Sequence, residues 1–91
     1  MEEEQAQKDF GEEVGKVTHF FANINVAVIK LTEGELEDGD TIRIKGATTD
    51  FEQDVKSMQI DHEDIEKAEK GQEFGMKVKD RVRKHDKVYK T

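Results

Sequence analysis

The stretch 55–78 constrains the fold more than any other part of the chain, because apolar residues alternate cleanly in its second half and a glycine turn precedes that half. Its second half alternates apolar with small or charged side chains, and the apolar set is Phe74, Met76 and Val78. Its first half contains another apolar set, Val55, Met58 and Ile60. A two-residue period is typical of a strand with one buried face, and Gly71 can adopt the positive φ of a tight turn. The stretch therefore predicts two antiparallel strands joined by a charged connection.

Alternation along the rest of the chain predicts an all-β domain. The expected strands span 13–21, 25–31, 40–45, 51–61, 73–79 and 87–90. Within the fourth of these the apolar parity changes, which predicts a β-bulge near Lys56 and Ser57. The segment 62–70 is too short and charged for an independent helix, so we expect a helical turn or an extended connection there.

The length of 91 residues suits a single domain, which we place at 13–91. Residues 1–12 form an acidic leader that we expect to be flexible. Leu36, Ile65 and Ala68 are apolar anchors within charged surroundings. The expected core consists of Val17, Val28, Ile42, Ile44, Val55, Ile60, Phe74, Met76 and Val78.

The chain is strongly charged, with 41% Asp, Glu, Lys and Arg and a net charge of −7. This composition resembles that of proteins from hyperthermophiles, in which surface ion pairs are abundant. The chain has no cysteine, and His19, His62 and His85 lack the spacing of a metal site, so we predict no metal and no cofactor. No apolar run approaches the ~18 residues of a membrane span, and the N-terminus does not resemble a signal peptide. These features predict a cytoplasmic protein that does not bind membranes.

The charge is unevenly distributed. Residues 1–13 hold six acids and one base, 14–75 hold fourteen acids and seven bases, and 76–91 hold two acids and seven bases. The three segments therefore have net charges of −5, −7 and +5, which sum to −7. The acidic body argues against broad nucleic-acid affinity, whereas the basic end leaves a local RNA site open.

A candidate RNA-binding patch lies in this basic end. If the chain is extended there, four basic residues share one face: Lys77, Lys79, Arg81 and Arg83. Lys84 and Lys87 add charge nearby, and Tyr89 adds a surface on which a base can stack. The alternative is a solvated strand whose lysines prevent edge-to-edge aggregation.

Several short motifs, taken together with their spacing, resemble one known family. They are GKV at 15–17, GDTI at 39–42, VKSMQI at 55–60, HE at 62–63, EKA at 66–68, Gly71, and FGMKV at 74–78. The set resembles the second domain of translation elongation factors Tu and 1-alpha, which belong to the translational GTPases. The resemblance implies a single closed antiparallel β-barrel of about six strands. It also implies a non-catalytic translation-factor-like module that contacts RNA, the ribosome or a translation factor.

In that family the barrel helps to hold the 3′ end of aminoacyl-tRNA. Carried over to this chain, the positions concerned are Gln59, Asp61, His62 and Glu73. His62 matches a histidine of the family pattern, whereas Asp61 and Glu73 place acids where a phosphate backbone would approach.

A second group of residues is similar to the C-terminal barrel of the collagenase-like peptidase family. The group comprises DFEQDV at 50–55, Met58, Ala68, GQ at 71–72 and DKVYK at 86–90. This resemblance implies the same fold with an alternative function, a protein-interaction or accessory β-barrel that makes no RNA contact.

Nothing in the sequence predicts catalysis. The chain lacks the G-x-x-x-x-G-K-[ST] loop that cradles phosphates, so we predict no nucleotide binding. Ser57 is the one serine, and it lacks the glycine frame of a nucleophile elbow. We therefore predict that the protein is not an enzyme.

Overall fold

The computed structural model describes residues 11–91, and this part of the chain contains strands and no helix. The strands are β1 (Glu12–Phe21), β2 (Val26–Leu31), β3 (Glu35–Glu37), β4 (Thr41–Lys45), β5 (Asp50–Asp54), β6 (Met58–Ile60), β7 (Glu63–Ile65), β8 (Lys67–Glu69), β9 (Glu73–Lys77) and β10 (Lys87–Lys90). The predicted all-β class is confirmed. Residues 1–10 of the predicted leader lie outside the described residues. The placement of one domain at 13–91 stays a prediction.

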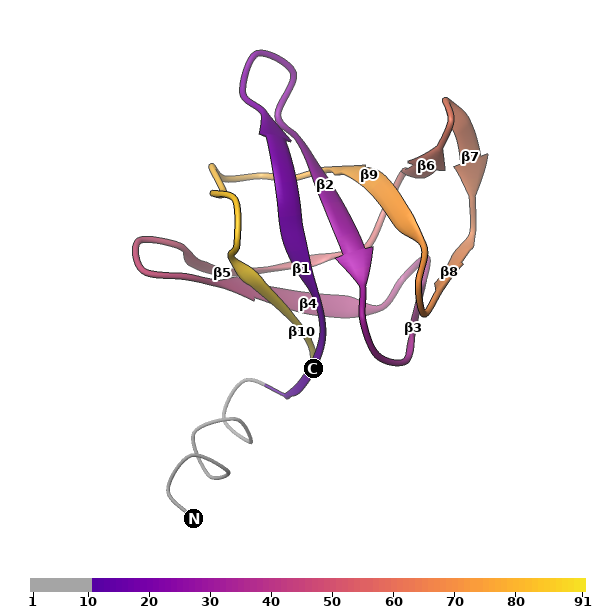
Figure 1. Cartoon of the computed structure of the whole chain (residues 1–91), viewed down its shortest axis with the longest axis horizontal. Helices are drawn as coiled ribbons and strands as arrows, with labels where there is room; N and C mark the ends of the chain where they lie inside the picture. Colours follow the sequence, from indigo (N-terminus) through magenta and orange to yellow (C-terminus); the bar gives the residue numbers. More distant parts are fainter. Residues whose placement is uncertain (1–10) are drawn as a thin grey trace.

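Eight strands form one antiparallel sheet in the order β5-β4-β10-β1-β2-β9-β6-β7, and β3 pairs with β8 in a second, two-stranded sheet. Figure 1 shows the strands curling around a shared interior, with the β1–β2 loop at the top of the view and the β4–β5 hairpin at the left. Within residues 11–91, no backbone pairing joins β5 to β7, the two ends of the large sheet. The prediction of a single closed barrel of about six strands is therefore wrong.

The sheet stays open because the predicted strand 51–61 is divided. β5 ends at Asp54 and pairs with β4, whereas β6 begins at Met58 and pairs with β9 and β7. Between them the chain turns at Ser57, whose φ is +59°. The apolar parity change thus marks a break between two ladders, and the prediction of a bulge within one continuous strand is wrong.

The charged segment 62–70, which follows β6, is extended. An extended connection was one of the two alternatives predicted from the sequence. It forms β7 and β8, and β8 pairs with β3 so that Ala68 lies opposite Leu36. Both side chains are completely buried. These two residues therefore attach the small sheet to the main core, as expected of apolar anchors in charged segments.

Most of the predicted core is confirmed. Seven of the nine side chains are at most 4% exposed, namely Val17, Ile42, Ile44, Val55, Phe74, Met76 and Val78. Ile60 is partly buried against the core cluster. Val28 was placed wrongly, because in β2 the residues Ala27, Ile29 and Leu31 face the core and Val28 faces outward, where it lines a surface hollow.

Candidate binding surfaces

The basic end of the chain does not form the extended strand that the candidate RNA patch required. β9 ends at Lys77, and the next strand, β10, begins at Lys87. The intervening residues form bends and turns around three buried side chains, Val78, Val82 and Asp86. The predicted alternation of Lys79, Arg81 and Arg83 on one strand face is therefore absent.

These side chains instead occupy separate environments. The Lys79 ammonium lies 5.9 Å from the centre of the Phe51 ring. Arg83 Nε donates a hydrogen bond to Thr48 Oγ1 at 2.9 Å, and Lys87 pairs with Glu13 at 3.7 Å. Arg81 lines a hollow beside the β4–β5 loop, and Lys84 is exposed in a turn.

Tyr89 was predicted to offer a stacking surface, but its side chain is only 7% exposed. It lies on β10, which is paired on both sides, with β1 and β4. Tyr89 alternates with the core residue Val88, so it lies on the other face of β10, opposite Glu13 and Arg43 of the neighbouring strands. Its ring is covered there and offers little surface for a base to stack on.

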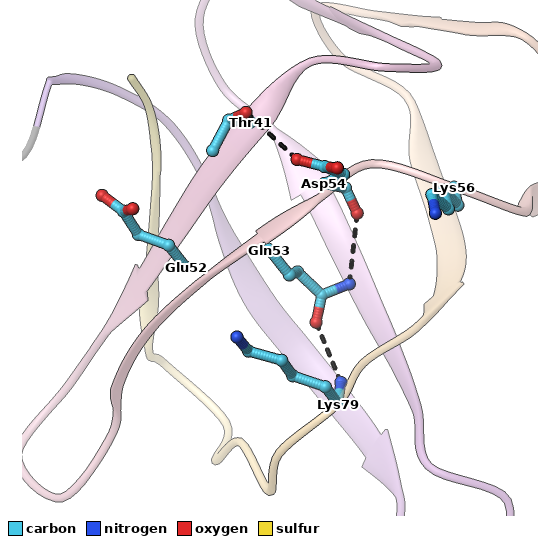
Figure 2. Close-up of a pocket in the computed structure, with 6 residues that line it drawn as sticks. All are labelled: Thr41, Glu52, Gln53, Asp54, Lys56 and Lys79. Atoms are coloured by element: carbon cyan, nitrogen blue, oxygen red, sulfur yellow. Dashed lines mark hydrogen bonds between the residues drawn. The ribbon is translucent and has the colours of Figure 1, made fainter.

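A charged hollow of about 510 Å³ lies beside β5, lined by Thr41, Glu52, Gln53, Asp54, Lys56 and Lys79 (Figure 2). Gln53 crosses from the edge strand β5 to the end of β9 and the residues just after it. Its Nε2 donates to the Lys77 carbonyl at 3.0 Å, and its Oε1 accepts from the Lys79 N–H at 2.9 Å. No backbone ladder joins β5 to β9. The side-chain amide of Gln53 therefore makes the bonds to the Lys77 carbonyl and the Lys79 N–H that a neighbouring strand would otherwise make.

We expect Gln53→Ala to lower the free energy of unfolding by about 1 kcal/mol, because both bonds are lost where water can partly replace them. Gln59→Ala is the matched control, since the Gln59 amide also donates an exposed bond, to Asp64, within the short β6–β7 pairing. Urea unfolding followed by circular dichroism compares the two variants. A smaller effect for Gln53→Ala than for Gln59→Ala would contradict a special stabilising role for the amide bridge, because the control loses a single exposed bond.

A second hollow, of about 500 Å³, lies on the outer face of the large sheet, and we call it the outer groove. It is lined by Phe21, Ile24, Val26, Val28, Gln59, Asp61, His62 and Gly75. The exposed large apolar side chains of residues 11–91 are Phe21, at 43%, and Ile24, at 53%, and both lie here. The described surface therefore has its main apolar feature at this site.

The floor of the outer groove follows from sheet register. Val28 of β2 lies opposite Gly75 of β9, and Gly75 lies opposite Gln59 of β6. Because glycine has no side chain, the outer face is hollow at this crossing. Gly75 does not need glycine for its backbone, since its φ is not positive and an added Cβ would meet Val26 Cγ1 at an ordinary 3.4 Å.

One wall of the groove is a two-residue turn between β6 and β7. Asp61 and His62 have φ values of +53° and +67°, and Ile60 pairs with Glu63. Positive φ at both central residues is the geometry of a type I′ hairpin turn, which glycine and asparagine favour. Non-glycine residues held in this region are strained and are found more often at functional sites.

Three of the positions carried over from the elongation-factor pattern lie together in this groove, namely Gln59, Asp61 and His62. The fourth, Glu73, accepts a hydrogen bond from Thr18 Oγ1 at 2.6 Å and does not line the groove. The apolar half of the groove was not predicted. Two signals pointed to it: the consecutive Phe20 and Phe21 break the strand alternation, and β2 is apolar on both faces.

No cluster of three His, Cys, Asp or Glu side chains in residues 11–91 could hold a metal ion. No helix in that range is long and apolar enough to cross a membrane.

The fold matches that of a known crystal structure, the C-terminal domain of a Geobacillus thermoleovorans protein described as a U32 peptidase. The TM-score is 0.81 over 88% of this chain and 92% of that domain, at 18% sequence identity. The selenomethionine form of the same domain gives a TM-score of 0.80. At this identity the match defines the fold alone. No protein-family model matches the chain.

Curated proteins are also similar to this chain in sequence. The chain is 47% identical over 78 residues to an uncharacterized protease of Methanocaldococcus jannaschii, which covers 85% of this chain and 19% of that protein. It is 40% identical over 78 residues to a collagenase of Porphyromonas gingivalis, of which it covers 22%. The chain thus spans about a fifth of the length of these relatives.

These matches overturn the translation-factor function predicted from the sequence. The relatives and the matching structure are named as a protease, a collagenase and a peptidase domain. None of them is a translation factor, and similarity to the elongation-factor second domain is not shown. The second resemblance, to the collagenase-like peptidases, is supported, so the RNA-binding and translation assignments were wrong.

Proposed function

We propose that this chain is a non-catalytic accessory domain of the U32-peptidase type, and that it binds unfolded polypeptide. The observation that supports this most directly is the proportion of the match. Nearly the whole chain is similar to the protease of M. jannaschii, yet four fifths of that protease lie outside the match. A module of this size serves a protease by holding substrate while the remainder performs the chemistry.

The matching crystal structure is consistent with a binding domain that is separate from the catalytic part, because it is a C-terminal domain that folds apart from the rest of its peptidase. The surface of the present chain also suits polypeptide binding. An apolar hollow with few polar groups is the usual form of a binding site in a protein, and the outer groove has this form. The accessory barrel without RNA contact, one of the two functions considered from sequence, is therefore retained as an accessory domain.

The test uses heat-denatured collagen, because one relative is named a collagenase. We expect the 91-residue protein to bind immobilised gelatin saturably, with a Kd between about 1 μM and 1 mM, as measured by surface plasmon resonance. Folded serum albumin serves as the control surface. A linear, unsaturated response on gelatin that equals the response on albumin would contradict the proposal.

The same preparation tests the non-catalytic part. Gelatin incubated with the protein alone should stay intact on an electrophoresis gel. New fragments that disappear when the protein is boiled beforehand would show that the chain has its own catalytic site.

A further inference from the structure

The two walls of the outer groove differ in their chemistry. The wall formed by 20–26 has no charged residue and contains both Phe21 and Ile24. The opposite wall, the β6–β7 hairpin at 58–65, has three acids and no lysine or arginine. One of these acids, Asp61, lines the groove itself and makes none of the ion pairs found among residues 11–91.

The groove continues into a smaller hollow of about 160 Å³ that shares Val26, Gln59 and Gly75 with it. Together the two hollows cross the outer faces of β2, β9 and β6, which are neighbours in the sheet. Neighbouring strands lie about 4.8 Å apart and an extended chain advances about 3.3 Å per residue, so the crossing accommodates roughly three to four residues. Lys77 is among the residues that line the smaller hollow.

We propose that the outer groove binds an extended polypeptide segment in which a large apolar side chain neighbours a lysine or arginine. The apolar side chain packs between Phe21, Ile24 and Val28, over Gly75. The basic side chain lies toward Asp61 on the acidic wall. This assignment deepens the proposed function and rests on it, since it specifies where and by what chemistry the polypeptide is held.

Charge favours this occupant over a second copy of the chain. A dimer formed through this face would bring a chain of net charge −7 against an identical one, with acidic hairpins near the contact. A basic peptide meets the same wall with opposite charge. Exposed ion pairs are weak individually, so the apolar contact supplies affinity and Asp61 supplies the preference for a basic neighbour.

The probe is a blocked pentapeptide, Gly-Leu-Lys-Gly-Gly, titrated into ¹⁵N-labelled protein and followed by amide chemical shifts. We expect shifts concentrated at 21–28, 59–62 and Gly75, and at least threefold weaker binding of the peptide with Glu in place of Lys. Asp61→Asn should remove this preference while keeping the turn, because asparagine tolerates the positive φ found there.

Two variants test whether the peptide binds in the outer groove or elsewhere on the surface. The double variant Phe21→Gln/Ile24→Gln should weaken binding of the peptide at least tenfold, and so should Gly75→Val, whose side chain fills the hollow. Ala47→Gln is the matched control, because Ala47 is exposed in the β4–β5 loop at another part of the fold. Phe21 and Ile24 are exposed, so their exchange leaves the core intact and the test does not depend on Gly75→Val folding.

The outcomes distinguish this inference from the proposed function. If the double variant binds gelatin and peptide as tightly as the native protein, the groove is the wrong site and the accessory function stands. If the native protein binds neither gelatin nor the peptide, both proposals fail. If the native protein is a dimer and the double variant is a monomer, the groove is a self-association surface and the peptide assignment is wrong.

Discussion

Replacement of Phe74 with alanine is expected to lower the free energy of unfolding by about 3–5 kcal/mol, the range typical for a fully buried phenylalanine. The Phe74 side chain is 1% exposed and heads the largest side chains of the core. It lies on β9, which joins β2 to β6 in the sheet order. A cavity here therefore loosens the packing of three neighbouring strands at once.

Phe21→Ala is a matched control for this change, because it removes the same atoms from a side chain that is 43% exposed. We expect Phe21→Ala to change stability by less than about 1 kcal/mol. Urea titration monitored by circular dichroism gives both values. For a domain whose total stability is about 5–15 kcal/mol, the Phe74 variant should unfold at a much lower urea concentration. Equal midpoints for the two variants would contradict the assigned core.

Local alternation predicted the strands well where a partner strand was available. The pattern of TIRIK at 41–45 places Ile42 and Ile44 inward, and both are fully buried. The candidate RNA patch instead required an extended chain from Lys77 to Arg83, and the structure has no strand beyond Lys77 until β10. A strand also requires neighbours whose backbone groups pair with its own along its length. The bonds of this segment instead go to the Gln53 side chain, to Asn25, to the single residue Val17 of β1 and to turns of its own.

Closure of the sheet is a second property that local patterns do not determine. The parity change at Lys56 and Ser57 is visible in the sequence, but a bulge in one strand and a break between two strands produce the same parity. The difference depends on which distant strands pair with each half. Here β4 pairs with one half and β9 with the other, so the barrel expectation failed at this point.

The outer groove was only partly predictable. Its polar residues Gln59, Asp61 and His62 were identified through the resemblance to a translation-factor domain, whose function does not apply. Its apolar floor was present in the sequence as a β2 strand that is apolar on both faces, a pattern typical of a strand covered on both sides. In this fold only the Ala27 face is covered. A partner bound in the outer groove would cover the exposed sides of Val26 and Val28.

Replacement of Gly46 with alanine is expected to lower the free energy of unfolding by about 2–3 kcal/mol. A Cβ at this position would overlap the Asp86 carboxyl group, at both Oδ1 and Cγ. Asp86 is 5% exposed, and its Oδ2 accepts a hydrogen bond from the Arg83 N–H at 2.8 Å. The carboxylate is short and enclosed, so relieving the overlap breaks that bond and leaves a buried charge poorly solvated.

Gly75→Ala is the matched control, because neither glycine has a positive φ and the new Cβ at Gly75 meets only Val26 at 3.4 Å. We expect this control to be neutral or to stabilise the protein by up to about 1 kcal/mol, since glycine within a strand is unfavourable. The double variant Gly46→Ala/Asp86→Ala should lose less stability than the sum of its two single variants, because the overlap is then absent. Simple additivity in urea unfolding, together with a Gly46→Ala effect no larger than that of Gly75→Ala, would show that the contact between Gly46 and Asp86 does not constrain the loop before β10.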